Sequence, residues 1–317
     1  MLDPSQTTFA TLTLSPAIDC TLTLDRPPTP GALHHVTGET VRPGGKGINV
    51  AKVLAARGLS VAAGGLLGQD NTAPFERLLA EMDIRDRFIR VPGETRRNLM
   101  VVHGAQEYKI NRQVFPELPY EEAFVRGAVI QLVAGADVVI LCGSLPVRFP
   151  SDTYARIVRV LRAMGKSVVL DTSGEALREG VLSKPTLIKP NRAEAEAFLG
   201  RTLATADDLR AACAELARHH DAVILSDGPS GAWFAQGGRI LHATSPKVKV
   251  VDTTAAGDML LAEFCAGFFP GFKLTPELAA RATACGAAAV ERCESNSPSQ
   301  ERVTDLAGLS VVTEYKA

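Results

Sequence analysis

The stretch VVDTTAAGDMLLAEFCAGFF, residues 250–269, decides how this chain is interpreted. A strand-like run ends at Val251, a turn of small residues follows at 253–257, and Asp258 then stands at the start of a long apolar helix. The peptide N–H groups of such a turn point outward in front of the positive end of the helix dipole, and small side chains let an anion reach them. The stretch therefore predicts an anion site beside a single carboxylate.

Two interpretations of Asp258 fit this position. A carboxylate there can accept a proton from a hydroxyl nucleophile, while the neighbouring amides hold a phosphoryl group that becomes more negative during transfer. An aspartate at a helix N-terminus also stabilises the helix as a cap and through its charge, with no part in any chemistry. Only the rest of the sequence can distinguish between the general-base and the helix-cap interpretation.

The remainder of the chain predicts an α/β fold. In its second part, helices alternate with short apolar strands such as VVIL (138–141) and AVIL (222–225). Continuous apolar strands are typical of a parallel sheet that is buried on both faces, and the alternation favours a doubly wound fold with right-handed crossovers. Two strand-rich segments, near 19–43 and 90–113, break this rhythm, and we expect a small sheet from them over one edge. We predict a single domain, residues 1–317.

Ligands of such sheets bind outside the carboxyl ends of the strands. Five polar or glycine-rich segments directly follow apolar strands of this sequence. We expect them to gather along one rim: 142–144, 171–173, 189–191, 226–228 and 252–258.

Composition argues against several classes of partner. The 317 residues carry a formal net charge of −1, so no basic surplus indicates nucleic acid or an anionic membrane. Six cysteines are scattered without a CxxC pair, which favours reduced thiols over zinc ligands or disulfides. The sequence begins without a leader pattern, and no window holds about 18 uninterrupted apolar residues. We expect a cytoplasmic protein that binds small molecules, with no nucleic acid or membrane partner.

A second glycine-rich stretch is RPGGKGINVAKVL. It places Gly44, Gly45 and Gly47 before a helix, with Lys46 among them and Asn49 one turn in. A glycine pair lets a ligand such as a sugar touch the backbone, and Lys46 could attract an anionic group. The GxxxxGK[ST] pattern of a Walker A loop is absent. A tight turn with a solvated lysine explains the stretch equally well.

A third motif is LIKPNRAEAEAFLG. Asn191 follows a strand, and Glu194 stands three residues later on the same face of the first helical turn. Asn-x-x-Glu is the pattern of a capping box, in which both residues only close the helix end. The alternative is that Glu194 organises Mg²⁺ through water near nucleotide phosphates, which is how magnesium usually binds.

Together these motifs resemble the PfkB (ribokinase-like) carbohydrate kinase family over roughly residues 8–295. The family's D-T-x-G-A-G-D signature is matched by residues 252–258, its G-G-x-G-x-N by residues 44–49, and its N-x-x-E by residues 191–194. The opening TLTLSPAIDCTLTL, with ETRRNL, YKIN and LCGSLP, is similar to the branch of 1-phosphofructokinases and tagatose-6-phosphate kinases. The resemblance implies a ribokinase-like fold in which the small sheet is a β-lid.

The resemblance also implies roles for individual residues. Asp258 would deprotonate the accepting hydroxyl, and the amides of Ala255, Ala256, Gly257 and Asp258 would hold the transferring phosphoryl group. The sugar phosphate would lie against Asp19, Gly44, Gly45, Lys46, Asn49, Arg96 and Ser144. ATP would lie along Lys189, Asn191, Ser226, Gly228 and Gly231, with Glu194 near Mg²⁺.

The implied activity is ATP-dependent phosphorylation of fructose 1-phosphate at its 6-hydroxyl. The alternatives are a tagatose-6-phosphate or fructose-6-phosphate kinase, and a kinase for an unphosphorylated sugar or a nucleoside. Relatives also suggest a potassium ion held by backbone carbonyls, and a homodimer through the lid.

Some positions depart from the family pattern. Ala255 replaces the first glycine of GAGD, at a strain cost of about 1 kcal/mol or more if its φ is positive. His34 or His35 stands where the lid usually carries a basic residue. These departures keep open a rival of another class, an inactive relative that only binds sugar phosphate.

Overall fold

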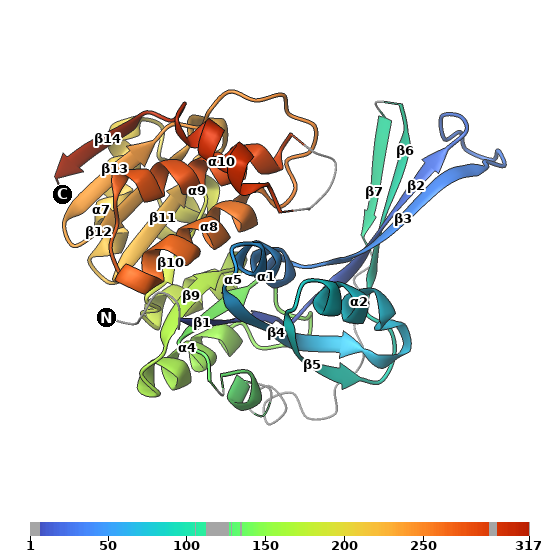
Figure 1. Ribbon diagram of the computed structural model, residues 1–317, viewed down its shortest axis with the longest axis horizontal. Helices are drawn as coiled ribbons and strands as arrows, with labels where there is room; N and C mark the ends of the chain where they lie inside the picture. The colour runs from blue at the N-terminus through green and yellow to red at the C-terminus, as the bar shows by residue number, and fades with distance from the viewer. Residues whose placement is uncertain are drawn as a thin grey trace.

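The computed structural model describes residues 7–104, 106–111, 127, 129–133, 135–291 and 297–316. Within this part of the chain, ten strands form one large sheet in the order β14-β13-β12-β11-β10-β9-β8-β1-β4-β5 (Figure 1). Their bounds are β1 Thr8–Thr13, β4 Ser60–Gly68, β5 Arg85–Val91, β8 Val138–Cys142, β9 Ser167–Asp171, β10 Leu187–Ile188, β11 Ala222–Ser226, β12 Ala232–Gln236, β13 Arg239–Ala243 and β14 Val312–Lys316.

The sheet is mostly parallel. All pairs from β5 to β11 are parallel, whereas β12, β13 and β14 add an antiparallel edge. Successive residues of the parallel strands point to opposite faces: Phe9 joins one buried apolar cluster, and Ala10 and Leu12 join the other. Burial on both faces explains why these strands read as continuous apolar runs.

Helices cover both faces of the sheet (Figure 1). Five contribute apolar side chains to one core cluster: α1 Lys46–Ala56, α2 Ala73–Glu81, α8 Ala256–Gly271, α9 Pro276–Ala289 and α10 Gln300–Ala307. Four contribute to the other: α4 Thr153–Ala163, α5 Gly174–Leu182, α6 Arg192–Leu199 and α7 Ala206–Ala217. The doubly wound α/β fold predicted from the sequence is confirmed.

A second sheet of four strands projects away from the large one (Figure 1, right). Its order is β3-β2-β6-β7, with β2 Ala17–Leu24, β3 Val36–Gly44, β6 Arg97–His103 and β7 Gln106–Asn111. This is the lid expected from the strand-rich segments 19–43 and 90–113. The second of these begins too early, because residues 90 and 91 belong to β5 of the large sheet; residues 112 and 113 lie outside the described residues.

Other local predictions need correction. The expected strand ending at Val251 is absent, since β13 ends at Ala243 and residues 244–250 carry no strand. Helix α1 begins at Lys46, so Gly47 lies inside it. The sequence also predicts a helix over 121–135, but most of that segment lies outside the described residues. Among those that are described, 127 and 129–133 are helical. Strand β5 was missed because its sequence, RDRFIRV, is dominated by charge at the sheet edge.

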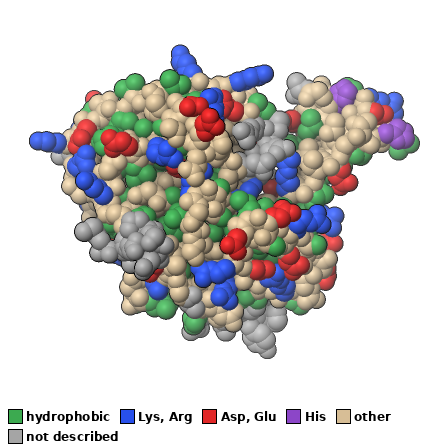
Figure 2. All heavy atoms as spheres, viewed as in Figure 1, with side chains coloured by type: hydrophobic (Ala, Val, Ile, Leu, Met, Phe, Trp, Pro, Cys, Tyr) green, Lys and Arg blue, Asp and Glu red, His purple; other side chains and the backbone are tan. Residues whose placement is uncertain are grey.

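Charged side chains of both signs are mixed over the face shown in Figure 2, and histidines appear near the end of the lid. Among the described helices, none combines the length and the apolar character that crossing a bilayer requires. The five described cysteines are buried free thiols, and Cys293 lies outside the described residues.

Candidate active site

Strand register builds one row of residues at the carboxyl edge of the large sheet. Thr13 at the end of β1 pairs with Cys142 of β8, and Cys142 pairs with Asp171 of β9. Lys189 directly follows the neighbouring strand β10. The strand order reverses between β1 and β8, because the chain goes from β1 to β4 on one side and from β8 to β9 on the other. Such a reversal is where open α/β sheets bind ligands.

Helix α8 begins at this edge, as the sequence predicted. Its N-cap is Ala255 with φ 63°, a left-handed conformation. The preceding turn is closed by Asp252, whose Oδ1 accepts hydrogen bonds from the Thr254 amide (2.9 Å) and hydroxyl (2.6 Å). Asp258 lies in the first turn of α8 and is only 6% exposed. The helix start and the buried carboxylate therefore come from one contiguous segment.

Asn49 of α1 holds the Asp258 carboxylate. Its side-chain amide Nδ2 donates a buried hydrogen bond of 2.9 Å to Asp258 Oδ2. Helix α1 can approach so closely because Gly47 has no side chain: a Cβ there would lie 2.3 Å from Thr13 Oγ1. Gly45 caps α1 with φ 134°, which favours glycine. The GGKG segment thus packs α1 onto β1 and aims Asn49 at Asp258.

Two lysines converge on a second buried carboxylate. Lys46 Nζ and Lys189 Nζ lie 3.0 Å and 3.3 Å from Asp171 Oδ1. Asp171 is fully buried and Lys189 nearly so, whereas the Lys46 side chain is 37% exposed. A Cβ on Gly257 would lie 3.3 Å from Lys189 Nζ, so this ammonium group lies against the backbone at the start of α8. The site therefore carries two cations close to the predicted anion site.

The environment shifts the pKa of both Asp258 and Lys46. Burial, reinforced by the charge of Asp171, raises the pKa of Asp258 to about 6, although Lys46, Asn49 and Lys189 act in the opposite direction. Burial alone would lower the pKa of Lys46, but the carboxylates of Asp171 and Asp258 raise it above its ordinary value. Lys46 is therefore charged at neutral pH, and Asp258 titrates near physiological pH.

The base of the lid contributes a separate polar group. Asn98 Nδ2 donates to Asp19 Oδ1 (2.8 Å), and Arg96 donates to Asn98 Oδ1 (3.0 Å) and to the Ser15 carbonyl (3.2 Å). Burial raises the pKa of Asp19, while Asn98 and Arg96 lower it. Gly44 is required here, because a Cβ would lie 2.1 Å from Asp19 Oδ2.

The predicted nucleotide residues form a third group, beyond β10 and β11. Asn191 caps α6 and Glu194 reaches back to it, so the capping box is present. Ser226 bridges to Asn191. Gly228 and Gly231 have positive φ in the turn between β11 and β12. Ser144 is exposed just after β8.

The structure thus joins Asn49 directly to Asp258, and it joins Lys46 and Lys189 through Asp171, close enough for their charges to act on Asp258. It also makes Asp171 central, although the sequence marked that residue only as part of a strand end. Its one available signal was the aspartate directly after the apolar run SVVL.

Comparison with known proteins identifies the chain's family. A family model described as pfkB family carbohydrate kinase matches residues 12–302. The chain belongs to this family. It is a carbohydrate kinase of the pfkB type, as the sequence motifs predicted, and kinases of this family use ATP.

Named relatives cover nearly the whole pfkB chain. The 1-phosphofructokinase of Xanthomonas campestris pv. campestris is 38% identical over 311 residues, covering 95% of this chain and 97% of that protein. The tagatose-6-phosphate kinase of Staphylococcus epidermidis is 32% identical over 262 residues, covering 81% and 84%. Phosphofructokinase-2 from Escherichia coli in complex with potassium has a TM-score of 0.84 and 25% identity, covering 97% of this chain and 99% of that one.

Ala255 gives a test of backbone strain at the start of α8. Its φ of 63° costs an alanine about 1 kcal/mol or more, whereas glycine adopts it freely. Ala255→Gly is therefore expected to raise the free energy of unfolding by about 0.5–1 kcal/mol, measured by urea unfolding. Ala266→Gly, in the middle of the same helix, should lower it by about 1 kcal/mol. A loss of stability in both variants would contradict the strain.

Proposed function

We propose that this pfkB kinase transfers the γ-phosphoryl group of ATP to the 6-hydroxyl of fructose 1-phosphate, giving fructose 1,6-bisphosphate and ADP. One observation carries the chemistry: a buried carboxylate, Asp258, held by Asn49 beside two lysine ammonium groups at a helix start. The choice of sugar is supported by relatives named 1-phosphofructokinase that are 36–38% identical over most of the chain.

In this mechanism Asp258 is the general base. Its carboxylate takes the proton of the 6-hydroxyl, the hydroxyl oxygen forms a bond to the γ-phosphorus, and the bond from that phosphorus to the bridging oxygen of ADP breaks. A pKa of about 6 keeps Asp258 mostly ionised at neutral pH yet basic enough to accept the proton.

Charge that develops on the phosphoryl oxygens needs fixed partners. The amides of Ala255, Ala256 and Gly257 stand at the N-terminus of α8, where the helix dipole is positive. Asp171 and the ionised Asp258 balance the charges of Lys46 and Lys189, and one positive charge is left for the phosphoryl group once Asp258 has taken the proton. In a site closed to water these preset charges lower the barrier more than they would in solution.

The sugar phosphate is assigned to the lid base and the start of α1. Asp19 would accept hydrogen bonds from sugar hydroxyls, and Arg96 would bind the 1-phosphate through its guanidinium group. Three further residues would complete this side: Gly44 and Gly45, which let the sugar touch backbone, and Ser144 at the end of β8.

The nucleotide is assigned to the third group of residues: Lys189, Asn191, Ser226, Gly228 and Gly231. The helix cap uses Oε2 of Glu194, and Oε1 accepts no hydrogen bond from the described residues. Glu194 therefore fits a role in which Oε1 holds Mg²⁺ through water, and the ion would neutralise the nucleotide phosphates. The Escherichia coli phosphofructokinase-2 structure was determined in complex with potassium, which supports a K⁺ site in this chain, and backbone carbonyls would hold the ion.

The lid is proposed to exclude water and to form a homodimer contact. Register places Val41, Cys20, Leu99 and Ile110 in one row across the small sheet, on the face opposite Asp19. Val41 and Ile110, on the outer strands, are 46% and 57% exposed, whereas Cys20 is buried and Leu99 packs against the core. Exposed apolar side chains on outer strands are typical of an interface. Sedimentation as a monomer at micromolar concentration would remove this part of the proposal.

The second candidate function is phosphorylation of tagatose 6-phosphate or fructose 6-phosphate at the 1-hydroxyl. It is favoured by the 32% identity with a tagatose-6-phosphate kinase. The same groups would serve it, with the sugar reversed so that its phosphate still reaches Arg96.

A panel of substrates tests the proposed function. ADP release is measured with fructose 1-phosphate, fructose 6-phosphate, tagatose 6-phosphate, fructose and a nucleoside. We expect the highest kcat/KM for fructose 1-phosphate. A higher kcat/KM for either 6-phosphate supports the second candidate function. Absence of turnover on every sugar phosphate would rule out both candidate functions.

Replacing Asp258 with asparagine tests the base directly. Asparagine keeps the size and can still bond Asn49, but it accepts no proton. We expect kcat to fall by about three orders of magnitude or more, with KM changed less than about threefold. Thermal unfolding serves as the control for folding. Turnover close to that of the unaltered enzyme would refute the assignment.

The raised pKa of Asp258 predicts a pH dependence. Below its pKa the carboxyl group is protonated and accepts no proton, so kcat should fall about tenfold per pH unit below pH 6 and level off above pH 7. The measurement uses saturating substrate, because the sugar phosphate itself has a pKa near 6. A flat profile between pH 5 and 7 would contradict the base role.

A further inference from the structure

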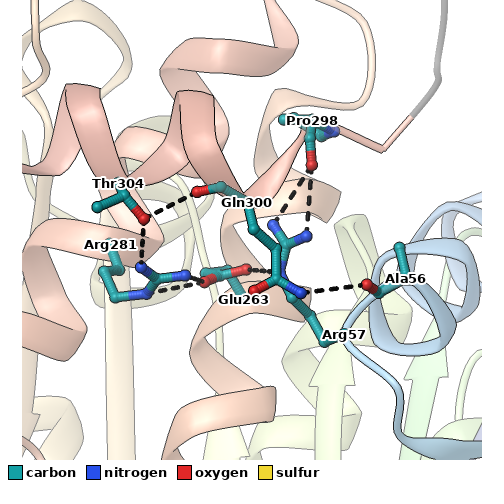
Figure 3. A network of polar contacts seen from close by, with 7 residues as sticks. All are labelled: Ala56, Arg57, Glu263, Arg281, Pro298, Gln300 and Thr304. Atoms are coloured by element: carbon teal, nitrogen blue, oxygen red, sulfur yellow. Dashed lines mark hydrogen bonds and ion pairs between the residues drawn. The ribbon is translucent and has the colours of Figure 1, made fainter.

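A buried ion pair joins the two helices that begin at the site. Arg57, the residue after α1, donates from Nε to Glu263 Oε2 of α8 at 2.7 Å (Figure 3). The two side chains are only 8% and 5% exposed. Neither residue belongs to the motifs that identify the family's site.

The pair is part of a wider polar network. Arg281 of α9 donates to the second oxygen, Glu263 Oε1, at 2.8 Å and 3.1 Å, and bonds Thr304 of α10. Gln300 of α10 donates to the Ala56 carbonyl at the end of α1 (Figure 3). Both oxygens of Glu263 are therefore occupied, and the end of α1 is held from two sides.

This ion pair links the end of α1 to α8, and the hydrogen bond from Asn49 to Asp258 links the two helices at the site. Both helices also contribute apolar side chains to one core cluster. Apolar packing is not directional, so it resists separation of the helices better than sliding along each other. A buried ion pair is directional, and fixing register is the best attested use of such groups.

We propose that Arg57 and Glu263 fix the position of α1 along α8 and thereby hold Asn49 on the Asp258 carboxylate. They are positioning residues, about 12 Å along α1 from Asn49. This rests on the proposed role of Asp258 as the base. A shift of about 1 Å at a reacting group can lower the rate about 100-fold, so a loss of the register between α1 and α8 should lower kcat.

The test removes the ion pair while keeping volume in the core. Replacing a buried ion pair with apolar residues of similar size often leaves stability unchanged or higher, so R57M/E263M should stay folded. We expect its Tm to change little, its kcat to fall about tenfold, and its KM to change less than about threefold. The pH midpoint of kcat should rise, because the Asn49 hydrogen bond lowers the pKa of Asp258.

A control removes an exposed arginine–glutamate pair far from the site. Arg239 and Glu314 join β13 to β14 at the sheet edge through bonds of 2.8 Å and 3.1 Å. The variant R239M/E314M should keep kcat within about twofold and leave the pH midpoint unchanged.

The outcomes separate the inference from the proposed function. If the unaltered enzyme turns over no sugar phosphate, the proposed function has failed. That result is obtained before any variant is made. A folded R57M/E263M enzyme with unchanged kcat and pH midpoint overturns the positioning role, as does an equal loss in the control. If R57M/E263M does not fold, R57M/E263Q, which leaves Arg281 an acceptor, is measured in its place. It is likewise expected to lower kcat and to raise the pH midpoint.

Discussion

Burial of the Asp258 carboxyl group beside a second buried acid, Asp171, is the constraint on which this site depends. The two carboxylates repel each other, and burial together with the charge of Asp171 disfavours the charged form of Asp258. Lys46 and Lys189 stabilise the charge of Asp171 by pairing with it. Asn49 stabilises the charge of Asp258 by donating a hydrogen bond to it. The result is a carboxylate with a raised pKa next to a net positive charge. This is the combination that proton removal and phosphoryl transfer require together.

The topology of the sheet assembles these groups from distant parts of the chain. Asn49 and Asp258 are separated by 209 residues and Lys46 and Asp171 by 125, yet each pair is in contact because β1, β8 and β9 end in one row. Helices α1 and α8 then meet above that row. The geometry of the site is thus set first by strand register and only then by side chains.

Features encoded within a few residues could be read from the sequence. The start of α8, the capping box at Asn191 and the glycines at 44–47 each reflect local chemistry, and each lies where it was expected except Gly47, which lies inside α1. The place of Asp171 on the rim was predicted, but its pairing with two lysines and the Arg57–Glu263 pair could not be foreseen, because both depend on which strands and helices become neighbours. The antiparallel edge formed by β12 to β14 was missed for the same reason, since strand direction is a property of the assembled sheet.

The account's central claim is that the Asp258 carboxylate meets the accepting hydroxyl of the sugar. A crystal structure with a non-hydrolysable ATP analogue and fructose 1-phosphate tests it most directly. We expect the 6-hydroxyl oxygen about 2.6–3.2 Å from an Asp258 oxygen, with the terminal phosphate on the amides at the start of α8. A bound sugar whose hydroxyls all lie beyond hydrogen-bonding reach of Asp258, with the terminal phosphate held elsewhere, would contradict the account.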